Sequence, residues 1–216
     1  MFTLYGHWRS LAAMRVRIAL ALKGLAYTER SVDILGGAQF APAYAAINPQ
    51  PAVPALVVDD GPPLFQSMAI LEWLEETQPD PPLLPADPRG RARVRGLCLI
   101  AAADSHPLLV PRVRARLASQ FGADEAAIAE WSRYFMEAAL AAAEGHIARD
   151  PVPGDWVHGD APGMADIVLY SLRAGHEQRG GTLEAYPCLA RIFARCAADP
   201  RFAAAHPRRQ PGAPAA

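Results

Sequence analysis

Residues 46–76 carry the pattern that most restricts the folds open to this chain. Ala55–Val58 is a short apolar run typical of a buried strand, and Asp60-Gly61 supplies the positive φ that a tight hairpin needs. Leu64-Phe65 then forms a second, antiparallel strand, and Ser67 stands at the N-cap position of an apolar helix. The stretch therefore predicts a strand, a hairpin, a second strand and a helix in close succession.

Two positions in this stretch suit a ligand. A helix start with a hydroxyl and unpaired amides favours an anion, which makes Ser67 a candidate binding residue. Pro54 enters its strand without an N–H, and a cis Val53-Pro54 bond would turn the Val53 backbone outward to pair with an extended peptide. Cis is the minority state, about 5% of X–Pro bonds, so the spacing leaves the isomer open.

The residues before this stretch complete a mixed α/β unit. Strands are expected at 2–5 and 27–32, and helices at 11–23 and 40–46. The resulting order, β-α-β-α-β-β-α up to Thr77, predicts a sheet with a parallel start and an antiparallel finish.

Five prolines between residues 79 and 88 exclude a helix or a central strand and indicate a linker. Every segment beyond it has helical periodicity, with helices expected at 89–109, 124–149 and 164–176 and another from Pro187. We therefore expect an α/β domain at 1–78, a linker at 79–88, an all-α domain at 89–206 and a flexible tail at 207–216.

The bulk composition excludes several classes of function. The net charge of −1 gives no electrostatic reason to expect a nucleic acid or an anionic membrane as a partner. No apolar run is long enough to span a membrane, and the N-terminal residues do not form a charged-then-apolar leader with a small-residue cleavage site, so a cytoplasmic protein is expected. Cys98, Cys188 and Cys196 lie in helical patterns without metal-ligand spacing, so we expect inert thiols and no metal site.

Six motifs in order resemble the glutathione transferase family, and the resemblance covers nearly the whole chain. They are Trp8-Arg9-Ser10 before RVRIALALKG, NPQPAVPAL, FQSMAILEWLEE, LLPADPRGRARVR, FGADEAAIAEW and Ala165-Asp166. Together with the Asp104-Ser105-His106-Pro107 segment, these motifs are most similar to the zeta class, which includes maleylacetoacetate and maleylpyruvate isomerases. The resemblance implies a thioredoxin-like first domain that binds glutathione, a helical second domain and a homodimer.

The resemblance also implies roles for individual residues. Ser10 corresponds to the serine that hydrogen-bonds the glutathione sulfur, and the backbone of Val53, beside Pro54, to the partner of the cysteinyl part. Gln66 and Ser67 correspond to the pair that holds the γ-glutamyl carboxylate. The further glutathione-binding positions are Gln39 and His106, and the substrate-binding positions are Arg9, Leu11, Ala12, Arg112 and Gln178. Arg9 is also, with Ser10, a candidate catalytic residue.

Each of these residues also has a simpler interpretation. Ser10 suits a helix N-cap, Arg9 an exposed charge, and His106 a ring that satisfies a carbonyl. Asp166 suits a structural residue that holds backbone amides near a helix start. The arginines at 89, 91, 93 and 95 suit a solvated face or, with Met68, a subunit contact.

The chain departs from the zeta pattern where the second substrate would bind. Leu11 and Ala12 replace polar groups, Leu109-Val110 replaces an asparagine pair, and Gln178 stands where an arginine is expected. These changes indicate a less charged, carboxylate-bearing electrophile. They also leave open an alternative, a glutathione-binding or interaction module with weak or no catalysis. A thiol–disulfide oxidoreductase is excluded because no cysteine precedes Cys98.

Overall fold

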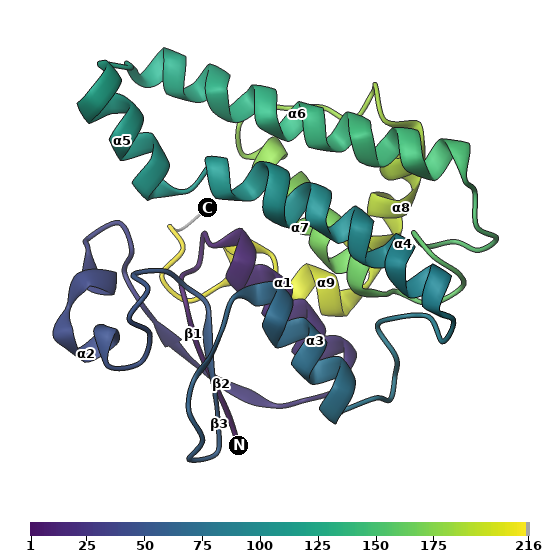
Figure 1. The fold of residues 1–216 in the computed structure, drawn as a ribbon, viewed down its shortest axis with the longest axis horizontal. Coiled ribbons are helices and arrows are strands. Elements are labelled where there is room, and N and C mark those ends of the chain that lie inside the picture. The colour runs from purple at the N-terminus through teal and green to yellow at the C-terminus, as the bar shows by residue number, and fades with distance from the viewer. Residues whose placement is uncertain (215–216) are drawn as a thin grey trace. The chain divides into compact units, whose positions relative to one another are not determined.

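The computed structural model describes residues 1–214 and divides the chain into two compact units (Figure 1). The first unit comprises Met1–Leu83 together with the described residues from Ala198 onward, and the second is Leu84–Ala197. This division differs from the expected boundaries, because residues 198–206 belong to the first unit and not to the helical one. Residues 215 and 216 of the expected flexible tail lie outside the described residues.

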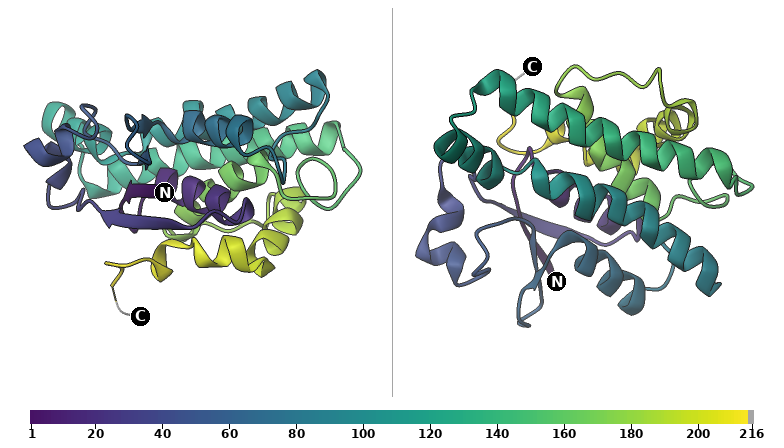
Figure 2. Two further views of the ribbon diagram at one scale, coloured as in Figure 1. Left: turned by 90° about the horizontal axis from the view of Figure 1, so that it is seen from below. Right: turned by 45° about the horizontal axis from the view of Figure 1, so that its top comes forward.

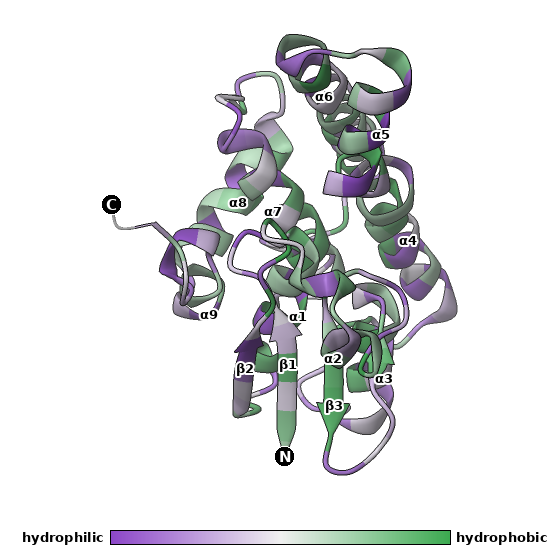
Figure 3. Ribbon diagram, turned by 90° about the vertical axis from the view of Figure 1, so that its left-hand side faces the viewer, coloured by the Kyte–Doolittle hydropathy of each residue, from purple (hydrophilic) through white to green (hydrophobic). Residues whose placement is uncertain are grey.

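The first unit is built on a four-stranded sheet. Its strands are β1 (Phe2–Gly6), β2 (Tyr27–Ser31), β3 (Ala55–Val58) and β4 (Leu64–Phe65). The order is β2-β1-β3-β4, with β1 parallel to β2 and antiparallel to β3, and β3 antiparallel to β4. The predicted mixed sheet is therefore confirmed. Figure 3 shows β3 as hydrophobic and the edge strand β2 as largely hydrophilic, as expected for strands inside a sheet and at its edge.

Four α-helices belong to this unit: α1 (Leu11–Leu22), α2 (Pro42–Ala45), α3 (Ser67–Thr77) and α9 (Pro200–Ala204). Helix α1 packs against α3 and α9 and is buried on nearly every face. It buries arginines at positions 15 and 17 as well as apolar side chains. Phe202 of α9 is fully buried, and this burial is the physical reason that the C-terminal residues join the first unit.

The second unit is helical, as expected. Its helices are α4 (Pro88–Leu99), α5 (Pro111–Phe121), α6 (Glu125–Arg149), α7 (Met164–Glu177) and α8 (Pro187–Ala198). Helix α7 packs against α4 and α6 and is almost wholly buried, which confirms its predicted central position. Figure 2 shows α4 running into a π-helical segment, Ile100–Ser105, that lies alongside α6. No helix within residues 1–214 is long and apolar enough to cross a membrane.

Two helical predictions need correction. The helix expected at 89–109 ends at Leu99 and is followed by the π-helical segment and a 3-10 turn, His106–Leu108. Helix α5 was not predicted, and none of its residues is buried. Val113, Leu117 and Phe121 do recur along one face, but the segment is only 11 residues long and contains three arginines, so it was not separated from the neighbouring helices.

Candidate active site

The register of the sheet brings three loops of the first unit together at one end of its strands. Tyr5 of β1 pairs with Ala55 of β3, and Ala55 pairs with Phe65 of β4. The loop that follows β1, the residues that enter β3 and the residues that leave β4 therefore lie at the same end of three adjoining strands. These segments contain Ser10, the Val53-Pro54 step and the Gln66-Ser67 pair, respectively.

Ser10 is the N-cap of α1. Its backbone is extended, and its Oγ accepts a hydrogen bond of 3.1 Å from the N–H of Ala13. A serine hydroxyl has one donor and two acceptor sites, so this cap bond leaves its proton available to a ligand. The first turn of α1 contains no acidic residue, and the helix N-terminus favours a negative charge beside it. The N-cap interpretation is confirmed and is compatible with the catalytic one.

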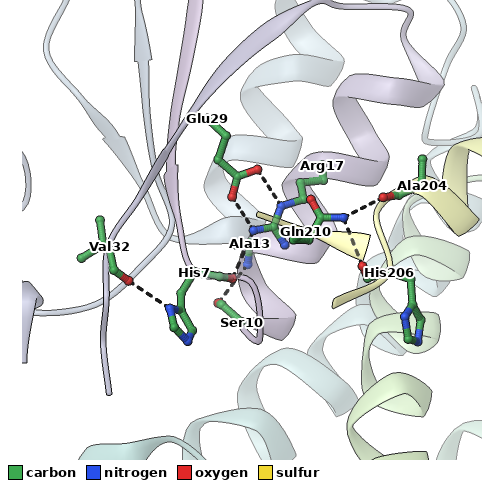
Figure 4. A network of polar contacts seen from close by, with 9 residues as sticks. All are labelled: His7, Ser10, Ala13, Arg17, Glu29, Val32, Ala204, His206 and Gln210. Carbon is green, nitrogen blue, oxygen red and sulfur yellow. Dashed lines mark hydrogen bonds and ion pairs between the residues drawn. The ribbon is translucent and has the colours of Figure 1, made fainter. Parts of the chain in front are cut away.

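The loop that carries Ser10 is held by the carbonyl oxygen of His7. This oxygen accepts hydrogen bonds from Ser10 N at 3.0 Å and from Arg17 Nη2 at 3.1 Å (Figure 4). The ring of His7 is buried, and its Nδ1 lies 3.1 Å from the carbonyl oxygen of Val32. Because a carbonyl only accepts, Nδ1 is the protonated nitrogen. Burial lowers the pKa of His7, which favours the neutral ring.

The Val53-Pro54 bond is cis, which settles the question that the sequence left open. The loop before it is anchored because the Ala52 carbonyl accepts hydrogen bonds from the Tyr44 hydroxyl at 2.7 Å and from Asn48 Nδ2 at 2.9 Å. Within residues 1–214, the backbone of Val53 forms no hydrogen bond to another residue. A fixed backbone with an unused donor and acceptor is suited to an extended ligand.

Gln66, and not Ser67, is the N-cap of α3, which corrects the sequence prediction by one residue. The turn out of β4 puts Gln66 at φ 67°, a left-handed conformation that costs a non-glycine residue about 1–3 kcal/mol. Such strain is found most often at functional sites. The side chain of Gln66 donates from Nε2 to Gln50 Oε1 at 2.9 Å.

Ser67 is the first residue of α3 and is buried. Its Oγ accepts a hydrogen bond of 3.3 Å from Nη1 of Arg15, whose side chain is only 1% exposed. An arginine has no acceptor, so the Ser67 proton cannot be donated back to it and points elsewhere. Sequence reasoning missed both Arg15 and Gln50, because arginine is normally exposed and neither residue forms a recognisable spacing with its partner, Ser67 for Arg15 and Gln66 for Gln50.

Gln39 lies in a 3-10 turn, Ala38–Phe40, and is buried. Among the described residues, its Oε1 has no hydrogen-bond donor. An unpaired buried acceptor costs about 1–3 kcal/mol, which a ligand N–H would remove.

The remaining predicted site residues differ in their surroundings. Arg9 is exposed at the end of the loop, whereas Leu11 and Ala12 are buried in the first turn of α1. His106, Arg112 and Gln178 belong to the second unit. Arg112 is exposed on α5, and Gln178 is the C-cap of α7 with its Nε2 buried and unpaired among residues 1–214.

Comparisons with known proteins agree with this arrangement. Residues 9–77 match the family model described as glutathione S-transferase, N-terminal domain. A maleylacetoacetate isomerase from Pseudomonas aeruginosa is 45% identical over 217 residues, which cover 99% of both chains.

Two solved structures are also very similar. One is a maleylacetoacetate isomerase from Methylobacterium extorquens with bound malonate and glutathione, with a TM-score of 0.95, 48% identity and coverage of 99% of this chain and 100% of that one. The other is a maleylpyruvate isomerase described as a bacterial glutathione S-transferase in the zeta class, with a TM-score of 0.94, 40% identity and coverage of 98% and 100%.

Near-complete coverage at these identities extends the match from the first unit to the whole fold. The chain therefore belongs to the glutathione S-transferase family, and within it to the zeta-class enzymes that include the maleylacetoacetate and maleylpyruvate isomerases.

Proposed function

We propose that this protein is a glutathione-dependent cis–trans isomerase that acts on an electrophilic, carboxylate-bearing alkene of the maleylpyruvate or maleylacetoacetate type. The observation that carries the proposal is the convergence of Ser10, Val53 and the Gln66-Ser67 pair at one end of the sheet. An extended tripeptide is long enough to contact all three loops, because each residue spans about 3.3 Å.

In this proposal, glutathione is held along its whole length by the first unit. Ser67 donates its hydroxyl proton to the γ-glutamyl carboxylate, because Arg15 already occupies an acceptor site of Oγ. Gln66 contacts the same end, and the Val53 backbone pairs with the cysteinyl residue. Gln39 accepts a hydrogen bond from the glycyl end through its unpaired Oε1.

Ser10 then donates its hydroxyl proton as a hydrogen bond to the glutathione sulfur. A free thiol has a pKa of about 8.5, and lowering it by about two units requires ~2.7 kcal/mol of preferential thiolate stabilisation. A hydrogen bond to a charged acceptor contributes about 1.5–3 kcal/mol, and the N-terminus of α1 adds about 0.3–1 kcal/mol. The two terms together match the requirement.

The reaction needs no redox partner. The thiolate adds to one alkene carbon, and the electron pair of the double bond moves to the adjacent carbonyl as an enolate. Rotation about the resulting single bond follows, and the enolate expels the thiolate as the trans double bond forms. Glutathione is regenerated unchanged, whereas protonation of the enolate carbon before the thiolate is expelled would leave a stable thioether conjugate.

The substrate carboxylates require cationic or polar partners. Arg9 is a candidate because it is exposed beside Ser10, and a guanidinium matches the geometry of a carboxylate. His106, Arg112 and Gln178 are the candidates from the second unit. The neutral Gln178, together with buried Leu11 and Ala12, favours an acceptor with fewer charges than a dianion.

The test combines two measurements on the whole protein. The thiolate absorbance of bound glutathione is titrated against pH, and maleylpyruvate, maleylacetoacetate and an aryl halide are assayed side by side. We expect a thiol pKa about two units below that of free glutathione and turnover of at least one cis-alkene. A shifted thiol with aryl halide turnover alone would retain the transferase and remove the isomerase assignment.

We further propose a cytoplasmic homodimer, with Met68 of α3 and the α4 arginines among its contacts. Arg93 is a weaker candidate for a dimer contact than the sequence suggested, because its guanidinium already donates to the carbonyl oxygens of Val157 and Asp150, each at 3.0 Å. Light scattering of the purified protein would measure the molar mass, and a monomer at micromolar concentration would contradict the proposal.

A further inference from the structure

The first unit contains a partly buried ion pair that reaches the loop of Ser10. The side chain of Arg17 on α1 is 1% exposed, and Glu29 of β2 accepts from it twice, from Nε at 2.9 Å and from Nη2 at 2.5 Å. A buried charge normally costs several kcal/mol unless its geometry and hydrogen bonding are nearly complete. The bidentate contact with Glu29 offsets much of the cost of burying Arg17, although Nη1 has no partner among residues 1–214. It does not account for the third hydrogen bond of this side chain.

That third bond joins the pair to the candidate active site. Nη2 of Arg17 also donates to the His7 carbonyl oxygen, the same atom that accepts the N–H of Ser10. Figure 4 shows Arg17 between Glu29 and the loop, with Ser10 and Ala13 at the start of α1. The position of Ser10 and the position of the ion pair are therefore coupled through one oxygen atom.

The residue beside the ion pair is a glycine, Gly6, which leaves room for both side chains. A Cβ at Gly6 would lie 2.9 Å from Glu29 Oε1 and 3.3 Å from Arg17 Nη2, so any larger residue there would displace the pair. The loop is also tied to the end of β2, because Val32 N donates to the Gly6 carbonyl oxygen at 2.7 Å. Glu29, Gly6 and Val32 thus hold both sides of the segment that presents Ser10.

We infer that Arg17 is a positioning residue for the thiolate-stabilising hydroxyl of Ser10, acting through the His7 carbonyl with Glu29 as its anchor. The inference rests on the proposed function, because it assumes that Ser10 contacts the glutathione sulfur. Arg17 fixes where the hydroxyl lies and does not itself touch the ligand. Its loss should change the thiol pKa of bound glutathione and kcat, while the affinity for the tripeptide, held mainly by other loops, changes little.

The main variant is Arg17→Lys. An ammonium keeps the charge opposite Glu29, but as a single point donor it cannot hold both carboxylate oxygens and the His7 carbonyl in the arginine geometry. We expect the thiol pKa of bound glutathione to rise by about half to one unit and kcat to fall about 10-fold, with KM for glutathione changed less than about twofold. Glu29→Gln keeps Arg17 in place while weakening its anchor, and should give the same direction of change if the lysine variant fails to fold.

The matched control lies on the same helix. Lys23, the C-cap of α1, is also buried and paired, with Glu75 Oε2 at 3.3 Å and the Pro81 carbonyl oxygen at 2.9 Å, but it does not contact the Ser10 loop. Lys23→Arg should lower the melting temperature and leave the thiol pKa unchanged. Arg30→Lys, an exposed exchange beside Glu29, should change neither quantity.

The outcomes separate the two proposals. If wild-type protein binds glutathione with an unshifted thiol, the role of Ser10 fails, and the inference about Arg17 fails with it. If the wild-type thiol is shifted and both Arg17→Lys and Glu29→Gln lose stability but keep that shift, the ion pair is purely structural and only the inference is overturned.

Discussion

Helices α1 and α7 are the most buried helices of their respective units, yet they use buried polar groups in different ways. Helix α1 buries Arg15 and Arg17, and each donates to a segment of the candidate active site. Helix α7 buries Asp166, whose oxygens accept from Val157 N and Gly163 N, each at 2.9 Å, and so hold the loop before their own helix. Burial alone therefore does not distinguish a functional residue from a structural one, whereas the segment that it contacts does.

Replacing Ser10 should have the largest effect and should separate function from stability most clearly. Ser10→Ala removes the hydrogen-bond donor to the sulfur, and we expect kcat/KM to fall about 10²–10³-fold. It also removes a helix cap, which costs about 1 kcal/mol of stability. Asp124→Ala removes the comparable cap of α6, where Asp124 accepts from Ala127 N at 2.8 Å, and should cost similar stability at full activity.

On α7, the expected effect is on stability alone. Asp166→Ala leaves the buried N–H groups of Val157 and Gly163 without their acceptor, and we expect the free energy of unfolding to fall by about 2–4 kcal/mol. Urea denaturation measures this loss, and kcat should be unchanged in the folded fraction below the unfolding transition. A variant that stayed stable but lost activity would contradict the distinction drawn between the two helices.

Ser67 tests the second contact of α1. Ser67→Ala removes the hydroxyl that accepts from Arg15, and we expect KM for glutathione to rise about 10-fold, equivalent to one hydrogen bond to a charged group. The thiol pKa of bound glutathione should stay at its wild-type value because Ser10 is unaltered. A raised thiol pKa with an unchanged KM would mean that the two contacts of α1 are not separate in function.

The smallest effect is a pH dependence confined to α7. Burial raises the pKa of Asp166 to about 6, against 3.8 for the unperturbed group, and its backbone hydrogen bonds offset this only in part. The protonated form is therefore favoured by folding. The contribution of Asp166 protonation to the free energy of unfolding is fully present below about pH 4 and is lost as the pH rises through about 6.

Between pH 7 and pH 5, the free energy of unfolding of the wild type should therefore rise by about 1 kcal/mol relative to that of Asp166→Asn. Urea titrations of both proteins at the two pH values measure the difference. An opposite sign would show that the backbone donors, and not burial, dominate the titration of this carboxyl.

The sequence was sufficient for the strands because their signals are local. Ala55–Val58 and Leu64–Phe65 have the predicted bounds, since an apolar run and an Asp-Gly turn determine them with little help from the rest of the chain. The N-cap of α3 was predicted one residue too late, at Ser67 and not at Gln66, because the positive φ of Gln66 follows from how the chain leaves β4. Helix α5 was missed because its apolar face is short and only half-buried, so its periodicity is weak beside that of α4 and α6.

The candidate site was predicted only in part, and for a related reason. Ser10, Val53, Gln66 and Ser67 could be identified because each stands in a recognisable motif. Arg15, Arg17 and Gln50 could not, because their importance comes from partners on other elements, 52 residues away for Arg15, 12 for Arg17 and 16 for Gln50. Residue type was misleading as well, since a buried arginine contradicts the usual preference of that side chain for solvent.

The first unit is discontinuous along the chain, and this has a consequence for biosynthesis. The segment that carries Phe202 packs on α1 but is translated more than a hundred residues after the sheet. A nascent chain with its sheet already outside the ribosome still lacks the final cover of α1. The N-terminal unit should therefore reach its mature packing only after α9 has been translated, and so after the helices encoded between its two parts have emerged.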